Sequence, residues 1–572
     1  MKLLSYITAL TLGVLSLTSC TDLDETVYDQ VSSGNYYNTR NDVIRAVLRP
    51  FEHGFWSIQS RHVLNELSAD QLITPSRDGW WDDGGVWRRY HYHTWNVEEG
   101  TIETEWNGCF QGIMQANYVI DDLQTLSADS FGFTEEEFNN LKAQCRVLRA
   151  WFYIRLLDNF RNVPLAISKD VNLNSKGQVS PQELFEFIET ELTECVGLLS
   201  VKTGSGGNDI YQAQWNKAGA AALLVRLYLN SEAWTGTARY NECAEWAERI
   251  LDGEFGTYSL ADRWDAPFDW NNEQCPEVIF AFTASQGYTF WHYQGDTYWW
   301  TTPSQFRYYI GDTKAEAGDH NCKYACTPSY DLNGNLYSYT LGNTVQKFRN
   351  YPEDVRLQLY RNLGNNTREG LFIFGKLPSL KEGEEFVTDP YGNYELNIRD
   401  AVGHFSNLTD DEWPQDKTSN LQSGDHNSGY HFAKYPFYAD EDAGQIESDF
   451  VEIRLTEVIY SLAECRLRSG RTDEAARLLN SVRRRNYPSE SWQTNLYAPE
   501  GGAVLDEQEM LDEWGREFFA ESRRRTDLVR FGMFNSGTWW DKQPDSDNHT
   551  AIFPVPRKAI DTNHNLTQNP GY

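Results

Sequence analysis

After Leu17 the sequence has no apolar run long enough to cross a bilayer, and it has few positive charges. A membrane-spanning helix takes about 20 apolar residues, so we expect none in the mature chain. Lys and Arg number 50 against 83 Asp and Glu, which gives a net charge of −33. That charge repels a polyanion such as nucleic acid. Two short Arg runs, 483–485 and 523–525, lie in predicted amphipathic helices, where we interpret them as solvated faces or ion-pair partners.

Motifs that mark common catalytic and metal centres are also missing. The sequence contains no G-x-S-x-G elbow, H-E-x-x-H, Walker A or dinucleotide fingerprint, and its Cys and His residues do not stand at zinc-site spacing. Residues 331–335 (DLNGN) are similar to a calcium loop but lack its glycine position and terminal Glu, which favours a turn. A glycosidase would need two carboxylates about 5–10 Å apart, and no motif singles out such a pair. We therefore predict no catalytic residue, metal site or cofactor.

The N-terminus is typical of an export signal. Met1-Lys2 gives a positive start, residues 3–17 are apolar, and 17–20 (LTSC) form a small-residue cleavage site. The pattern resembles a bacterial lipoprotein signal, with residues 1–19 removed and Cys20 acylated; an ordinary secretory signal with an incidental Cys is the alternative. Acyl chains stabilise membrane binding by about 0.8 kcal/mol per buried CH₂. We expect a folded body on a lipid tether.

The other eight cysteines are scattered, and most fall in predicted helices, where a thiol behaves as a small apolar core residue. Cys322 and Cys326 are close enough in sequence for a local disulfide, which an oxidising compartment would favour. Spacing alone leaves that pairing open.

Helical patterns fill both ends of the chain and predict its frame. Thr134 with Glu137, and Ser180 with Glu183, form capping boxes that mark two helix starts. Further helices are predicted at 38–55, 105–123, 215–229, 240–251, 448–469, 472–486 and 506–522. Small residues in the 448–486 pair give the layout of a tetratricopeptide hairpin, and the 215–251 pair resembles it more weakly. Several such hairpins would form an α-solenoid, although any tight helical hairpin favours small residues there.

Aromatic residues make up 14% of the chain and gather in two stretches that lack a helical or alternating period. The first is 79–95 (GWWDDGGVWRRYHYHTW) and the second is 290–300 (FWHYQGDTYWW). The second lies in a long non-periodic region, which inside a compact protein is usually functional. For the first, an irregular core loop is the alternative, because Trp is usually well buried.

These stretches supply what a glycan site needs. A sugar ring has an apolar C–H face and a rim of hydroxyls, so its site combines aromatic planes with carboxylate, amide or guanidinium groups. The predicted glycan-binding residues are Trp80, Trp81, Trp87, Arg88, Tyr90, Trp291, Tyr298, Trp299 and Trp300. Because adjacent Trp side chains usually point apart, we expect about half of these rings to be structural. The strongest candidates are Trp81, Trp87, Trp291 and Trp299.

Several phrases along nearly the whole chain resemble the SusD/RagB family, the lipid-anchored glycan-binding subunits of Bacteroidetes outer-membrane uptake systems. They are 20–25 (CTDLDE), 66–70 (ELSAD), 148–165 (LRAWFYIRLLDNFRNVPL), 454–463 (RLTEVIYSLA), 513–532 (EWGREFFAESRRRTDLVRFG) and 553–572 (FPVPRKAIDTNHNLTQNPGY). The resemblance implies a mostly α fold: a SusD-like α-solenoid frame of about four tetratricopeptide-like hairpins with long irregular, loop-rich insertions. Residues 20–572 would form one domain, with the frame near 35–252 and 448–530 and a loop-rich ligand-binding region near 253–447.

The resemblance also implies a function. Family members bind polysaccharide or oligosaccharide and deliver it to a SusC-like TonB-dependent transporter, which the lipoprotein covers as a lid. Their sites are built from the loop after the ELSAD-like phrase and from the irregular region, where the two aromatic stretches lie. We expect a non-catalytic protein at the surface of the outer membrane, anchored through Cys20, that binds a neutral glycan such as xylan, glucan or fructan. A glycoside hydrolase acting on the same glycan and a helical-repeat protein-binding adaptor are the alternatives.

Overall fold

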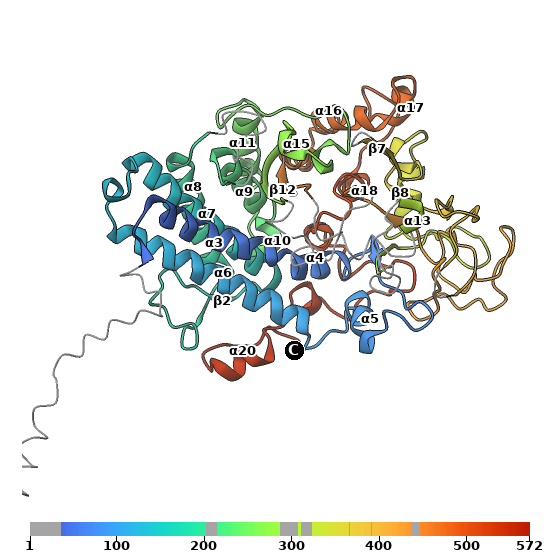
Figure 1. Cartoon of the computed structure of the whole chain (residues 1–572), viewed down its shortest axis with the longest axis horizontal. Helices are drawn as coiled ribbons and strands as arrows, with labels where there is room; N and C mark the ends of the chain where they lie inside the picture. Colours follow the sequence, from blue (N-terminus) through green and yellow to red (C-terminus); the bar gives the residue numbers. More distant parts are fainter. Residues whose placement is uncertain are drawn as a thin grey trace, which may run out of the picture.

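The computed structural model describes residues 36–201, 214–285, 307–310, 323–364, 367–389, 392–436 and 447–572. Helices lie mainly in two stretches of the chain (Figure 1). The first contains α3 (Arg40–Trp56), α4 (Ile58–Glu66), α5 (Val86–His91), α6 (Gly100–Thr125), α7 (Glu135–Phe160), α8 (Pro181–Leu198), α9 (Lys217–Leu229), α10 (Ser231–Thr235) and α11 (Tyr240–Leu251). The second contains α15 (Leu455–Arg468), α16 (Thr472–Arg483), α17 (Trp492–Asn495), α18 (Glu507–Glu517), α19 (Arg524–Arg530) and α20 (Arg557–Thr562). Between them lie the short helices α13 (Arg307–Ile310) and α14 (Thr344–Arg349).

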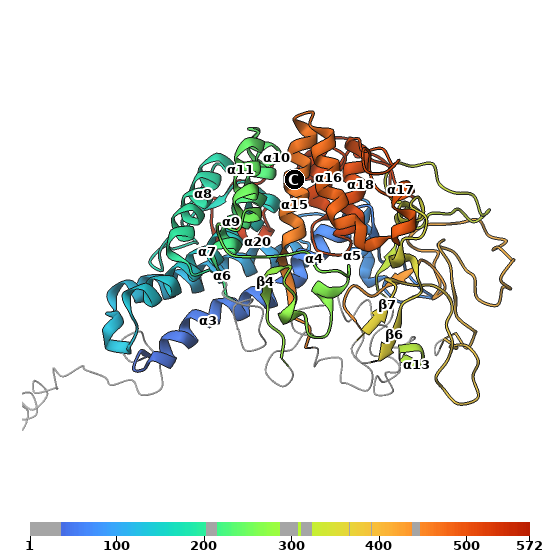
Figure 2. The same cartoon turned by 90° about the horizontal axis from the view of Figure 1, so that it is seen from above.

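Successive helices of the frame pack against each other. Helix α6 packs on α7, α7 on α8, α8 on α9, α9 on α11, and α15 on α16. Helix α11 also packs on α15, although the whole loop-rich region separates them in sequence. Figure 2 shows these helices on one side of the molecule and the loop-rich region on the other. The mostly helical, hairpin-built fold expected from the sequence is confirmed.

The predicted capping boxes set two helix starts. The Glu137 N–H donates to Thr134 Oγ1 at 3.2 Å, and the Thr134 N–H donates back to Glu137 Oε2 at 2.8 Å. Ser180 and Glu183 bond in the same way, with Pro181 as the first residue of α8. Such side chains satisfy backbone N–H groups that have no partner within the helix.

Some predicted boundaries are wrong. The predicted helix at 448–469 begins as strand β12 (Phe450–Arg454), because these residues pair antiparallel with β4 (Val278–Phe282), and α15 follows only then. The predicted helix at 506–522 ends at Glu517. Helix α10 lies between α9 and α11, where no helix was predicted from the sequence.

Strands in the described residues are short and form antiparallel pairs. The other pairs are β1 (Leu72–Ile73) with β5 (Ala325–Cys326), β2 (Val163–Pro164) with β3 (Gln178–Val179), β6 (Arg361–Gly364) with β7 (Thr367–Glu369), β8 (Phe372–Ile373) with β11 (His431–Phe432), and β9 (Gly375–Lys376) with β10 (Asn397–Ile398). Apart from β2–β3, which lies between α7 and α8, these pairs cross-link the irregular region or join it to β1, and the region appears in yellow and light orange on the right of Figure 1.

The two Arg runs supply buried ion pairs. Arg483 is buried and pairs with Glu513, and Arg525 is buried and pairs with Asp158 at 3.2 Å. Of the two sequence interpretations, ion pairing is therefore confirmed for these side chains.

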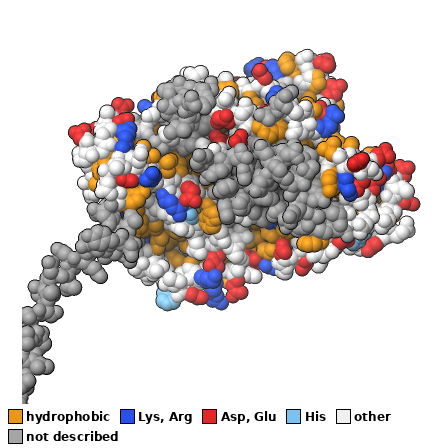
Figure 3. Space-filling view, viewed as in Figure 1, with side chains coloured by type: hydrophobic (Ala, Val, Ile, Leu, Met, Phe, Trp, Pro, Cys, Tyr) orange, Lys and Arg blue, Asp and Glu red, His pale blue; other side chains and the backbone are white. Residues whose placement is uncertain are grey.

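On the face in Figure 3, Lys and Arg side chains are scattered among Asp and Glu. None of the helices in the described ranges combines the length and apolar character that crossing a membrane requires.

Candidate functional site

The aromatic stretch 79–95 is shaped by left-handed backbone at its start. The φ angle is positive at six neighbouring positions, namely Asp78, Gly79, Trp81, Asp83, Gly84 and Gly85. At Trp81 φ is 61°, a region that bulky side chains rarely adopt. Strained residues of this kind persist only where the surrounding structure holds them, and they cluster at binding sites.

The second part of the stretch differs from the predicted loop. Helix α5 occupies Val86–His91, directly after a 3₁₀ turn at Asp83–Gly85. Six residues are too few to show a helical period, so this helix could not be predicted from the sequence. The helix fixes which side chains of the stretch point inward.

Neighbouring segments hold the stretch from both sides. The buried Arg77 side chain donates to the Ser428 carbonyl at 2.9 Å, which ties the start of the stretch to the irregular region. At its other end, His93 is hydrogen-bonded to the Asp545 carboxylate and to the Ser68 carbonyl, both at 2.7 Å. Since Ser68 belongs to the ELSAD phrase, that phrase anchors the aromatic stretch that follows it.

The candidate side chains of this stretch differ in exposure. Trp80 is 45% exposed, and Trp81, Trp87 and Arg88 are partly buried. Tyr90 is 0% exposed and lies on the buried side of α5. Its ring face is therefore closed to a ligand in this structure, and we place Tyr90 in the core behind the site.

Trp87 is held by two polar partners. Its Nε1–H donates to Asp83 at 2.7 Å, and the Lys323 ammonium lies 3.6 Å from the ring centroid. The same ammonium lies 5.7 Å from the ring centroid of Trp81. A cation over an aromatic face contributes about 0.5–2 kcal/mol. A ligand that stacked on Trp87 would have to use the opposite face.

Sequence reasoning missed Lys323. It is buried and reaches the site because β5 pairs with β1, just before the aromatic stretch. A single Lys at the edge of a non-periodic region gives no local signal, so only the strand pairing could have identified it.

Carboxylates and one guanidinium lie in the same stretch as the exposed Trp80. Asp78 and Asp83 are exposed, and the partly buried Asp82 pairs with Arg88. These groups are of the kinds that accept from and donate to sugar hydroxyls. Within the described ranges, no three His, Cys, Asp or Glu side chains gather as a possible metal site.

The second aromatic stretch lies outside the described residues, and so do its candidates Trp291, Tyr298, Trp299 and Trp300. The acylation candidate Cys20 lies outside them too, as does Cys322 of the possible disulfide; Cys326 is buried. After the second stretch the described residues are α13 (Arg307–Ile310) and then the chain from Lys323, which contacts Trp87. Lys323, in the loop-rich region beyond the second stretch, therefore lies against the first stretch.

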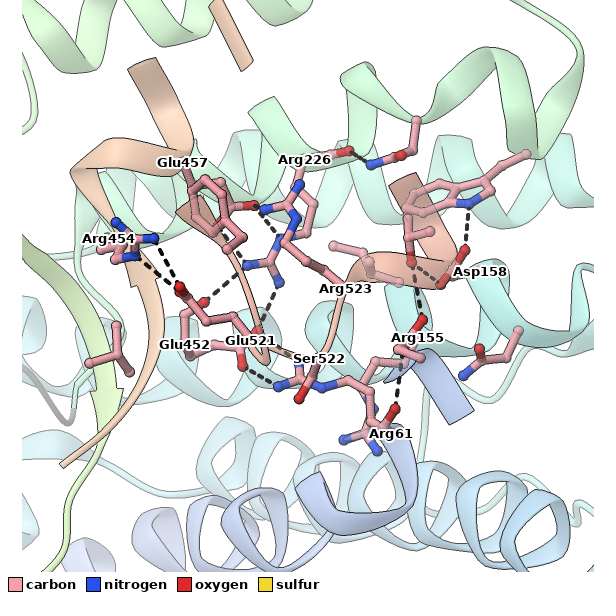
Figure 4. A pocket seen from close by; sticks show the side chains of 18 residues that line it. Arg61, Arg155, Asp158, Arg226, Glu452, Arg454, Glu457, Glu521, Ser522 and Arg523 are labelled. Atoms are coloured by element: carbon pink, nitrogen blue, oxygen red, sulfur yellow. Dashed lines mark hydrogen bonds and ion pairs between the residues drawn. The ribbon is translucent and has the colours of Figure 1, made fainter. Parts of the chain in front are cut away.

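A cavity of about 70 Å³ lies inside the frame, and half of the side chains that line it are charged (Figure 4). Arg61 pairs with Glu452 at 2.6 Å, and Arg226 pairs with Glu457 at 2.8 Å. Burial raises the pKa of Glu452, but the charges of Arg61 and Arg226 outweigh it and bring the pKa to about 2. Small-molecule sites measure about 300–1,000 Å³, so this cavity has room for water and not for a sugar. Its ion pairs join the two halves of the frame.

Comparison with known proteins identifies the family. A family model described as the SusD family matches residues 277–572, more than half of the chain. A second model, described as "Starch-binding associating with outer membrane", matches residues 55–229. The chain belongs to the SusD family, as the resemblance in the sequence implied.

Its relatives cover almost the whole chain. The starch-binding protein SusD of Bacteroides thetaiotaomicron is 27% identical over 556 residues, which cover 91% of this chain and 86% of that protein. Among solved structures, a laminarin-binding SusD-like protein has a TM-score of 0.62 at 17% identity and covers 94% of this chain and 100% of its own. B. fragilis NanU has a TM-score of 0.64 at 18% identity, with 95% and 99% covered. At these identities the structures establish the shared fold.

Proposed function

We propose that the protein is a non-catalytic glycan-binding lipoprotein of the outer cell surface. It captures a neutral polysaccharide or oligosaccharide and delivers it to a SusC-like TonB-dependent transporter. The observation that carries this proposal is the half-exposed Trp80, which lies next to Trp81 on a strained loop with exposed carboxylates that leads into α5 and Trp87. Such a surface matches the apolar face and hydroxyl rim of a sugar.

The names of relatives support the ligand class. One relative is named a starch-binding protein, and one protein of solved structure is named a laminarin-binding SusD-like protein. Starch and laminarin are both uncharged polysaccharides. A net charge of −33 disfavours sulfated or uronate-rich ligands through long-range repulsion. We therefore propose a neutral glycan as the ligand.

Both aromatic stretches contribute to the proposed site. The contact between Lys323 and Trp87 supports this, because it brings a residue of the loop-rich region, which also contains the second stretch, against the first stretch. The proposed wall residues are Trp80, Trp81, Trp87, Arg88, Trp291, Tyr298, Trp299 and Trp300. Tyr90 is buried in the core behind the first aromatic stretch and supports it there.

The proposed location follows from the N-terminus and the family. Residues 1–19 act as the signal peptide, and 20–572 form one domain anchored in the outer membrane through acylated Cys20. The family description "associating with outer membrane" supports this location. Cross-linking in native outer membranes, followed by mass spectrometry, should recover a β-barrel transporter as the neighbour.

Two measurements on the same mixtures test glycan binding and catalysis. The purified protein is run by affinity electrophoresis in gels containing starch, laminarin, xylan or fructan, and each mixture is assayed for new reducing ends. We expect retardation by at least one glycan without new reducing ends. Steady release of reducing sugar would identify a glycoside hydrolase, and no retardation by any glycan would favour a protein-binding adaptor.

A further inference from the structure

A groove of about 610 Å³ opens on the loop-rich region. Its walls come from residues 330–334, from the end of α14, from the β9–β10 pair and from segment 410–430. The volume lies within the range of small-molecule sites, about 300–1,000 Å³. None of the predicted glycan-binding residues contributes to its lining.

Three partly buried aromatic side chains, Tyr330, Trp413 and Tyr430, line the groove. Trp413 packs edge-to-face on Phe405 with ring centroids 6.1 Å apart, and Tyr430 stacks on Phe374 at 4.9 Å. Packing on the protein side therefore sets the orientation of both rings. Rings that are oriented before binding suit the C–H face of a sugar, because little ordering is needed on association.

The turn beside Trp413 has room for the indole. Gly334 has φ of +79°, and a Cβ there would lie 3.2 Å from Trp413 Cζ2, so a larger residue would crowd the ring. The Asp331 carboxylate accepts the N–H groups of Asn333 at 2.8 Å and Asn335 at 2.9 Å. This confirms the turn predicted for DLNGN, and the closed turn gives the groove a fixed wall.

Polar groups form the rim of the groove. Asn397 Nδ2 donates to Asp410 Oδ1 at 2.8 Å, and the Lys376 ammonium lies 3.5 Å from the same carboxylate. The Asp410 side chain is 63% exposed, so it can also accept from a ligand. Arg399 braces this rim by donating to the carbonyls of Thr409 and Asp410, both at 2.9 Å. Donors and acceptors in this arrangement match sugar hydroxyls.

We propose that this groove is a second carbohydrate-binding site, which takes a further segment of the same neutral polysaccharide. The inference rests on the proposed function, because the ligand is the chain captured at the aromatic stretch. Trp413 supplies the main stacking plane, and Lys376, Asn397 and Asp410 bond the hydroxyls. A second contact on one chain acts at a high effective concentration, so it raises the affinity for a long polysaccharide more than for a short oligosaccharide.

Isothermal titration calorimetry with a polysaccharide that retards the wild type, and with a short oligosaccharide of the same linkage, tests the groove. Trp413→Ala should lower the affinity for the polysaccharide about threefold to tenfold, the fold-change of one stacking contact. The affinity for the oligosaccharide should change by less than about twofold. Trp56→Ala removes a 39% exposed Trp on α3 and serves as the matched control.

A variant that lacks the Trp rings at the start of the first aromatic stretch distinguishes binding at the groove from binding at that stretch. Trp80→Ala/Trp81→Ala should retain weak polysaccharide binding, and adding Trp413→Ala should abolish it. If the wild type binds glycan and Trp413→Ala changes neither measurement, the second site is wrong while the proposed function stands. If the wild type binds no glycan, the proposed function fails and the second site with it. Should Trp413→Ala lose its fold by circular dichroism, Asp410→Ala at the exposed rim replaces it, with the same losses expected.

Discussion

Asp70 and Arg524 form a buried bidentate ion pair, in which Arg524 Nε and Nη2 donate to the two carboxylate oxygens at 2.6 and 3.1 Å. Asp70 precedes the aromatic stretch, whereas Arg524 begins α19 near the end of the chain. The Gly342 N–H donates to the same carboxylate at 2.9 Å. The N-terminal helices, the loop-rich region and the C-terminal helices therefore meet at this one group, which supports the base of the candidate site.

Breaking the Asp70–Arg524 ion pair should lower the free energy of unfolding. Asp70→Asn leaves the Arg524 charge buried without its counter-charge, so we expect the free energy of unfolding at neutral pH to fall by about 3–5 kcal/mol. Urea denaturation measures this change. The double variant Asp70→Leu/Arg524→Leu removes both charges, so its free energy of unfolding should fall by less than that of Asp70→Asn. A single variant as stable as the wild type would contradict the role given to the pair.

The contribution of Asp70 should also depend on pH. Burial raises the pKa of Asp70, but the charges of Arg524 and Lys347 and the hydrogen bond from Gly342 outweigh it, so the pKa falls from 3.8 to about 2. A carboxylate with a lowered pKa adds stability that is full above its unfolded pKa and is lost as the pH falls through its folded pKa. The stability difference between the wild type and Asp70→Asn should therefore shrink from about pH 4 to about pH 2. A constant difference over that interval would rule out this linkage.

Trp80 should contribute directly to glycan binding. Replacing it with Ala removes a half-exposed ring, and we expect the affinity for a retarding glycan to fall about threefold to tenfold, since a stacking contact contributes about 0.5–1.5 kcal/mol. Calorimetry measures the loss, with Trp56→Ala as the control for removing an exposed Trp elsewhere. Equal losses in both variants would show that the effect is not specific to the aromatic stretch.

Tyr90 should contribute to the stability of the fold and not directly to glycan binding. Its side chain is fully buried, so Tyr90→Ala should lower the free energy of unfolding by about 3–5 kcal/mol through loss of burial and an unfilled cavity. Trp80→Ala should cost less than about 1 kcal/mol in the same urea experiment. If Tyr90→Ala kept its stability but lost glycan affinity, Tyr90 would belong to the ligand-facing wall.

Cys20→Ala should release the protein from the membrane fraction, because the acyl chains supply the anchor. Fractionation of cells and labelling with radioactive palmitate check this together. The wild type should carry the label and sediment with membranes, whereas the variant should do neither. An unlabelled wild type would favour an ordinary secretory signal.

The helical frame could be predicted because its signals are local. Thr134 and Ser180 each form a capping box with a Glu three residues later, so one turn of sequence marks the start of each helix. The small residues of α15 and α16 lie within one helical hairpin. Strand β12 could not be predicted in this way. Its residues also fit the start of a helix, and only the pairing with the distant β4 decides between the two.

The position of the candidate site could be predicted, but the direction of its side chains could not. Trp80 and Tyr90 stand in one aromatic stretch, yet one ring is half-exposed and the other is buried. The difference depends on α5, which is too short to leave a period in the sequence. Lys323 reaches Trp87 through the β1–β5 pair, a long-range contact that no local pattern encodes.

The contact between α11 and α15, together with the β4–β12 pair, has an evolutionary consequence. The loop-rich region leaves the frame and rejoins it at adjacent points, so both of its ends are already fixed there. Doubling the length of a flexible loop with fixed ends costs only about 0.6 kcal/mol. Selection can thus lengthen or shorten loops of this region, while the β1–β5 pair and the Gly342–Asp70 hydrogen bond keep its inner part on the frame. A constant helical frame with variable loops allows two proteins to share a fold at low sequence identity. This chain and the laminarin-binding protein do so at 17% identity.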